Sequence, residues 1–206
     1  MKPAVSAVFK RLKKMVIFIP FIFILLSAES PRPYISPVES PSKVIDGLEF
    51  SVVTQSEWRS TDPFMEVKVR IVLQLRITNR LDHPILFPTF DTYSVCLKTA
   101  EGVDMVLGGG RDKTFVTPNI LLQPGSSYTQ PIETTIEYTR DSQVAKLVMR
   151  DETGSTAWAS LNAGRYTVFI KVFPTQYDFA KRAELPAPLW AGEGTTESVG
   201  FVLYGP

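Results

Sequence analysis

The alternation of apolar and polar residues from Met65 to Ile77 constrains the fold of this chain more than any other feature of its sequence. Every odd-numbered position in this segment is apolar, and the even-numbered positions are polar or charged except for Val72. Side chains of a β-strand point alternately to opposite faces of a sheet, so the pattern predicts a strand with one buried and one solvated face, as in antiparallel sheets. At ~3.3 Å per residue such a strand would span roughly 43 Å, so we expect a bulge at Val72 that lets it serve two sheets.

Seven further segments have the composition of strands, and turn residues such as Asn79 to Pro84 and Gln123 to Gly125 separate them. The predicted strands cover residues 48–54, 85–87, 94–99, 128–135, 146–149, 166–173 and 199–204. With 206 residues, of which 44% are hydrophobic, the chain has material for one sizeable core. The sequence therefore predicts an all-β fold, a two-sheet sandwich over residues 46–206.

The N-terminal 28 residues have the composition of an export signal or a membrane anchor helix. Five basic residues precede an apolar run from Met15 to Leu26, which is shorter than the ~20 residues of a spanning helix. Ala28 suits a cleavage site, whereas Leu26 does not, so a cleaved signal peptide and an uncleaved anchor both stay open. In either case the basic cluster should remain cytoplasmic, and we expect the rest of the chain to be extracytoplasmic, either secreted, periplasmic or tethered.

Residues 29–45 are predicted to be a linker, because the prolines between Ser30 and Pro41 favour extended conformations and lack amide donors. The formal net charge of the whole chain is +1, and it becomes −4 when the five basic residues of the leader are removed. No run of Lys or Arg follows residue 28, so neither charge nor pattern favours nucleic-acid binding. We expect contact with a membrane only through the N-terminal segment.

The segment Leu161-Asn162-Ala163-Gly164-Arg165-Tyr166 resembles the corner that leads into a late strand of immunoglobulin-like domains. The resemblance covers roughly residues 46 to 205 and implies an immunoglobulin-like sandwich in which the hydroxyl of Tyr166 bonds to backbone upstream. The two cysteines that join the sheets of antibody domains are absent, since Cys96 is the only cysteine. Antibody-type function is therefore not implied.

A weaker resemblance links Thr78-Asn79-Arg80, Pro84 to Phe87 and Leu97 to Gly102 to bacterial proteinase-inhibitor sandwiches of the BsuPI type. It implies the same fold, and it leaves inhibition of a proteinase as an alternative function.

The sequence contains no recognisable catalytic site. His83, the only histidine, is the only available base for a Ser-His-Asp system, and no Gly-x-Ser-x-Gly elbow is present. Gly108-Gly109-Gly110 lacks the spacing of a phosphate loop and is predicted to be a flexible hairpin tip. No Cys/His or Asp/Asn-Gly series has metal-ligand spacing, so we expect no metal and no cofactor. Cys96 is interpreted as a small buried strand residue.

The long loop of residues 174–196 is the segment from which we expect binding. It carries Tyr177, Phe179, Leu189 and Trp190, and in an immunoglobulin-like fold it projects from the same end as the turn that contains His83. These five residues form the predicted binding surface. Alternatively, the loop caps the core, with one or two helical turns over residues 175–184. Trp58, which follows the first strand, is expected at the opposite end.

These observations favour an exported, envelope-associated binding module with no enzyme activity, whose partner is a protein or a glycan. A structural or adhesion domain at the envelope is the alternative. A proteinase inhibitor or a hydrolase has less support.

Overall fold

The computed structural model describes residues 36–59, 68–89, 91–111, 119–138, 144–150, 155–175 and 185–205. The chain divides into two units, residues 1–34 and residues 35–206, and all described residues belong to the second unit. This part of the protein is all-β, in several sheets and without a helix. Consequently, none of the described segments forms a helix that could cross a membrane. The predicted leader lies outside the described residues, as do the helical turns predicted for residues 175–184 except for Thr175, which is not helical.

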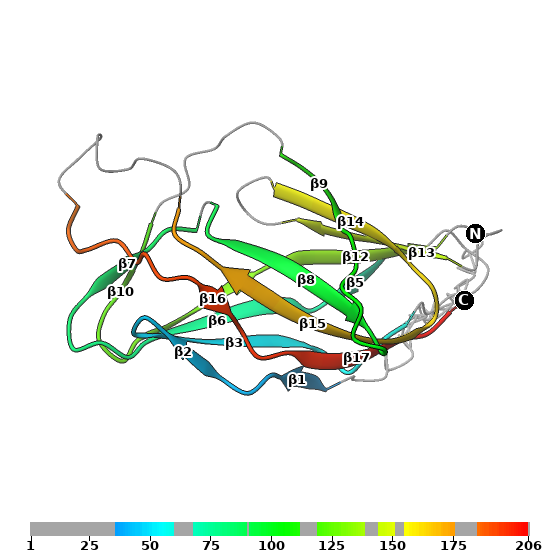
Figure 1. Ribbon diagram of the computed structural model, residues 1–206, viewed down its shortest axis with the longest axis horizontal. Coiled ribbons are helices and arrows are strands. Elements are labelled where there is room, and N and C mark those ends of the chain that lie inside the picture. The colour runs from blue at the N-terminus through cyan, green and yellow to red at the C-terminus, as the bar shows by residue number, and fades with distance from the viewer. Residues whose placement is uncertain are drawn as a thin grey trace, which may run out of the picture. The chain divides into compact units, whose positions relative to one another are not determined.

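The strands form four hydrogen-bonded groups, here called sheets A to D (Figure 1). Sheet A has the order β1-β3-β6-β11, with β2 on β3: β1 (Pro37–Glu39), β2 (Lys43–Ile45), β3 (Leu48–Gln55), β6 (Leu73–Asn79) and β11 (Ser127–Pro131). Sheet B has the order β16-β15-β17-β4, with β8 on β15: β4 (Glu57–Trp58), β8 (Tyr93–Thr99), β15 (Gly164–Val172), β16 (Gly194–Thr195) and β17 (Val199–Leu203). Sheet C has the order β5-β12-β13-β14-β9: β5 (Lys68–Ile71), β9 (Gly108–Arg111), β12 (Glu133–Tyr138), β13 (Ala145–Arg150) and β14 (Ser155–Leu161). Sheet D pairs β7 (Ile85–Phe87) with β10 (Ile120–Leu122).

The long alternating segment serves two sheets, as its sequence predicts. It is divided at Val72 into β5, which pairs with β12 in sheet C, and β6, which pairs with β3 and β11 in sheet A. The neighbouring segment of the sheet divides at the same level, because Ile132 separates β11 from β12. The amide of Ile132 donates to the carbonyl of Leu73 at 2.9 Å. Val72, the residue that breaks the alternation, is 41% exposed. Two neighbouring strands therefore pass together from sheet A into sheet C.

The core consists of the inward-facing residues of these strands, and one face of each alternating strand supplies them. Leu73, Leu75 and Ile77 of β6 are buried, whereas Arg76 between them is not. Trp58 is fully buried in β4 and stacks on Phe201, with ring centroids 3.6 Å apart. Trp58 lies beyond the C-terminal end of β3, whereas Leu48 at the start of β3 pairs with Asn79. Trp58 and the Asn79 turn therefore lie at opposite ends of β3.

The corner predicted at Tyr166 is present. Its hydroxyl donates to the carbonyl oxygen of Asn162 at 2.8 Å, and its ring stacks on Phe201 at a centroid distance of 5.6 Å. Burial raises the pKa of the Tyr166 hydroxyl. The hydrogen bond fixes the start of β15 to the turn before it.

The folded unit extends into the predicted linker. Pro37, Val38 and Glu39 pair with β3 through Gln55, Thr54 and Val53. Proline is tolerated here because β1 lies at the edge of sheet A, where a missing amide breaks no interior ladder. The linker composition therefore gave no indication of this strand.

The predicted strands match β3, β7, β8, β13, β15 and β17, with their ends shifted by up to two residues. The segment 128–135 is two strands, β11 and β12, because the chain changes sheets at Ile132. The sequence did not predict β9, β10 and β14, or the short strands β1, β2, β4 and β16.

Candidate functional site

The predicted binding loop closes the core instead of presenting its tryptophan to solvent. Trp190 is 2% exposed, and its ring lies 5.4 Å from that of Phe50 and 5.5 Å from that of Phe87, between centroids. This burial corrects the expectation that Trp190 lies on a binding surface, and it matches the alternative capping role. Tyr177 and Phe179 lie outside the described residues.

The same loop does meet the end of the domain that carries the His83 turn (Figure 1, left). Leu189 forms a parallel bridge with Leu86. The amide of Trp190 donates to the carbonyl of Leu86, and the amide of Leu86 donates to the carbonyl of Pro188, both at 2.8 Å. Leu189 is partly buried in this contact. The predicted proximity of the two segments is therefore confirmed.

His83 lies on the surface of its turn. Its Nδ1 is 2.8 Å from Oδ1 of Asp82, and its carbonyl accepts from the side chain of the buried Asn79. The imidazole lowers the pKa of the exposed Asp82 carboxyl. Across the described ranges, no group of three His, Cys, Asp or Glu side chains could hold a metal ion. Burial raises the pKa of the half-buried Cys96 thiol and keeps it in the unreactive form.

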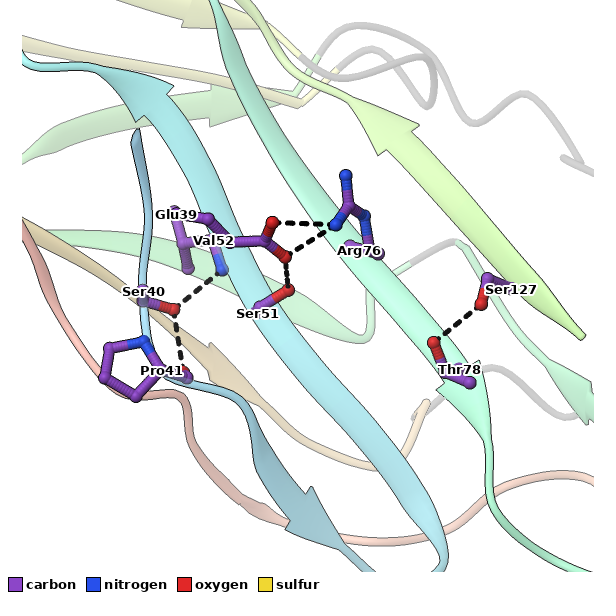
Figure 2. Close-up of polar contacts among 8 residues, drawn as sticks. All are labelled: Glu39, Ser40, Pro41, Ser51, Val52, Arg76, Thr78 and Ser127. Atoms are coloured by element: carbon purple, nitrogen blue, oxygen red, sulfur yellow. Dashed lines mark hydrogen bonds and ion pairs between the residues drawn. The ribbon is translucent and has the colours of Figure 1, made fainter. Parts of the chain in front are cut away.

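The outer face of sheet A holds a groove of about 500 Å³ that is lined by charged and hydroxyl side chains, here called the polar groove (Figure 2). Nη1 of Arg76 lies 2.8 and 2.7 Å from the two carboxylate oxygens of Glu39, and the hydroxyl of Ser51 donates to the same carboxylate at 2.5 Å. These contacts connect β1 to β6 across β3. The amide of Val52 donates to the hydroxyl of Ser40 at 3.0 Å.

The remaining polar groups of this groove are also paired with one another. Arg80 bonds Glu49 through Nε, and this contact and Ser42 lower the pKa of the Glu49 carboxyl. The hydroxyls of Thr78 and Ser127 lie 2.8 Å apart across the β6–β11 pair. The charges and most of the hydroxyls of the polar groove already have protein partners. The groove is therefore best explained as a set of contacts that holds the edge strand β1 to sheet A.

The outer face of sheet C presents a different surface, centred on Trp158 of β14. The Trp158 side chain is 42% exposed, whereas the other two tryptophans, Trp58 and Trp190, are buried. Its neighbours along the same row of the sheet are Val148, Thr135 and Arg70 on one side and Gly108 on the other. A half-exposed indole on a sheet face leaves an aromatic surface that a ligand can contact.

Glycines of β9 form the floor on which the indole of Trp158 lies. A β-carbon added to Gly108 would be only 2.2 Å from Nε1 of Trp158, and one added to Gly110 would meet Cη2 and Cζ3 at 3.6 Å. Gly108 and Gly110 share one face of the strand and are spaced by roughly 7 Å, about the length of an indole. The ring therefore lies flat along β9, with one face on the glycines and the other toward solvent.

This arrangement corrects the interpretation of the glycine run. Gly108, Gly109 and Gly110 are strand residues paired with Trp158, Ala157 and Thr156, and not a flexible hairpin tip. Glycine is needed because a larger residue at position 108 would displace the indole. Trp158 was not among the predicted binding residues. The signal available for it was the alternation of Thr156, Trp158 and Ser160 with the apolar, inward Ala157, Ala159 and Leu161.

Polar side chains lie on the β13 side of Trp158, across β14 from the glycines of β9. Lys146 pairs with Ser160 and Arg150 with Thr156, so both basic residues are diagonal neighbours of Trp158 on the adjacent strand. Farther along the sheet, Nζ of Lys68 lies 2.8 Å from Oε1 of Glu137 and lowers the pKa of that carboxyl. A flat aromatic ring with hydrogen-bonding groups on its margins, here called the Trp158 platform, can stack a ring-shaped ligand and bond its periphery.

Comparison with known protein families, curated proteins and solved structures finds no match to this chain. The structure defines an all-β protein of several sheets, whose strands pair antiparallel except for β17 and β4 in sheet B.

Proposed function

We propose that this domain is a binding module that acts outside the cytoplasm, and that its ligand is a glycan whose sugar ring stacks on Trp158. The observation that supports this proposal is the fixed, flat and half-exposed indole above Gly108 and Gly110. One face of a pyranose ring carries C–H groups, which favour contact with an aromatic face, while its hydroxyls need hydrogen-bonding partners. The platform offers both kinds of contact.

The surroundings of the ring favour a glycan over a protein partner. Protein interfaces place hot-spot aromatics among further apolar side chains that exclude water. On this face the neighbours of Trp158 are the glycines of β9, the partly buried Val148 and the polar Thr156, Ser160, Lys146 and Arg150. A lone ring bordered by polar groups suits a hydroxylated ligand.

The proposed location rests on the leader, in which five basic residues precede the apolar run of residues 15–26. We also propose that sheets A to C together form an immunoglobulin-like sandwich. The hydrogen bond from Tyr166 to Asn162 and the passage of two strands between sheets support that arrangement.

Binding of the full-length protein, purified in detergent, to a panel of immobilised polysaccharides tests the function. We expect the wild-type protein to retain a subset of the panel. The variant Trp158→Ala should lose about five- to 150-fold in affinity, because stacking on an aromatic ring contributes ~1–3 kcal/mol. Trp158→Phe should retain part of the binding.

Tyr204→Ala is the matched control, since Tyr204 is an exposed aromatic residue directly after β17, with Arg59 over its ring at 4.1 Å. Its glycan binding should equal that of the wild type. Equal retention by Trp158→Ala and the wild type, or no retention of any polysaccharide by the wild type, would contradict the proposal.

A further inference from the structure

The outer face of sheet C carries an excess of positive charge. Its described side chains include four basic residues and two acidic ones, which are listed here: Lys68, Arg70, Lys146, Arg150, Glu133 and Glu137. The chain after residue 28 has a formal charge of −4, so this face has the opposite sign to the domain that carries it.

Little of this positive charge is held in ion pairs. Lys68 is paired with Glu137, but Arg70, Lys146 and Arg150 form no ion pair with any described residue. Glu133 and Glu137 lie opposite Arg150 and Lys146 in the register of β12 and β13, and both basic residues contribute through space to the lowered pKa of Glu137. The two glutamates leave an excess of two positive charges on this face, whereas in the polar groove of sheet A each arginine forms an ion pair with a glutamate.

We infer that the glycan bound by the Trp158 platform is acidic, with carboxylate groups that Arg150 and Lys146 bind on the β13 side of the stacked sugar. This inference rests on the proposed function and names its ligand class. Both basic residues are exposed, and they are the two diagonal neighbours of Trp158 on β13, roughly 7–8 Å away. A guanidinium donates two parallel hydrogen bonds to a carboxylate, which makes Arg150 the stronger of the two contacts.

Arg70 extends the site along the sheet. It lies in the same row as Trp158, three strand spacings away, which is ~14 Å. The row between them contains only Val148 and Thr135, neither of them large or charged. An oligosaccharide laid along this row from Trp158 would bring a later acidic sugar to Arg70.

An oligogalacturonide and its carboxyl-reduced form test the inference, because they share one backbone and differ in charge. The full-length protein in detergent is labelled with fluorotryptophan, so that the three tryptophans give separate signals and Trp158 reports binding locally. We expect the oligogalacturonide to shift the Trp158 signal at a concentration at least about tenfold below that needed with the reduced form. Added salt should weaken the binding of the acidic ligand and not that of its reduced form.

The variant Lys146→Gln/Arg150→Gln should bind the oligogalacturonide about tenfold more weakly and the reduced form as the wild type does. The control Lys43→Gln/Lys171→Gln removes the same charge from exposed positions of sheets A and B and should have no effect. Signals of the buried Trp58 and Trp190 verify that each variant is folded.

Equal affinity of the wild type for the two forms, or an unchanged preference in the Lys146/Arg150 variant, would overturn the inference of an acidic ligand and leave the proposed function standing. Failure of both forms to shift the Trp158 signal, together with an empty polysaccharide panel, would overturn the proposed function itself.

Discussion

Gly108 passes beneath the indole of Trp158 so closely that a β-carbon at this position would lie 2.2 Å from Nε1 of the ring. The two residues are paired in register between β9 and β14, 50 positions apart in the sequence. The glycine thus sets how far above the sheet, and at what tilt to it, the indole of the only exposed tryptophan lies.

Replacement of Gly108 with alanine should displace the indole and reduce glycan binding as strongly as the loss of Trp158. The added methyl group overpacks the contact, for which we expect a loss of ~1–3 kcal/mol in the free energy of unfolding. Urea denaturation and the polysaccharide assay measure the two effects. In the control Gly109→Ala, the β-carbon meets only a carbonyl oxygen at 3.6 Å, so both quantities should stay near wild type.

Tyr166→Phe should lower the free energy of unfolding by about 1 kcal/mol, the usual contribution of one intramolecular hydrogen bond. The substitution removes the bond from the hydroxyl to the carbonyl of Asn162 and leaves the ring stacked on Phe201. Tyr204→Phe is the control, because the Tyr204 hydroxyl is exposed and its hydrogen bond to Glu57 is long, at 3.4 Å. A Tyr166→Phe protein as stable as the wild type would show that the corner does not contribute to stability.

Thr54→Val should destabilise the protein by about 1–3 kcal/mol, although the two side chains have the same shape. The hydroxyl of Thr54 accepts from Nε1 of the buried Trp58 at 3.2 Å and donates to the carbonyl of Val72 at 2.8 Å. Valine leaves the indole N–H buried without a partner at the point where the chain changes sheets. Thermal unfolding measures the loss, and a change below a few tenths of a kcal/mol would contradict this account.

Glu39→Gln should cost less than about 1 kcal/mol and leave glycan binding unchanged. The Glu39–Arg76 pair is partly exposed, and surface ion pairs contribute little to stability. A double-mutant cycle with Arg76→Gln measures the coupling, which should decrease as salt is added. Loss of glycan binding in Glu39→Gln would instead indicate that the polar groove is the ligand site.

The Glu49 carboxylate should make stability depend on pH in the acid range. Its pKa is lowered below the ordinary value of 4.5 by the contacts with Arg80 and Ser42, so the folded state binds this proton less readily than the unfolded state. Its contribution is therefore present in full above pH 4.5 and is lost as the pH falls through the lowered pKa. The stability difference between the wild type and Glu49→Gln should be constant near neutral pH and disappear in acid.

Local pattern was sufficient to predict the all-β class and the break at Val72, because each depends on residues close together in the sequence. The hydrogen bond of Tyr166 was expected from the resemblance of its turn to the corner of immunoglobulin-like domains. The role of Gly108 could not be predicted, since glycines have no side-chain pattern and the indole that explains them comes from a distant strand. Trp190 was expected on the surface because aromatic residues in a long loop look alike whether they cap a core or bind a partner. Only the packing of the Trp190 ring against Phe50 and Phe87 distinguishes the two roles.

Quenching of tryptophan fluorescence by acrylamide, with and without a polysaccharide that the protein retains, tests the central claim most directly. Trp58 and Trp190 are buried, so the quenchable emission of the free protein should come from Trp158. We predict that a saturating polysaccharide removes most of this quenchable fraction, because the sugar covers the exposed face of the indole. Saturation that leaves the quenchable fraction unchanged would contradict the assignment of Trp158 as the binding platform.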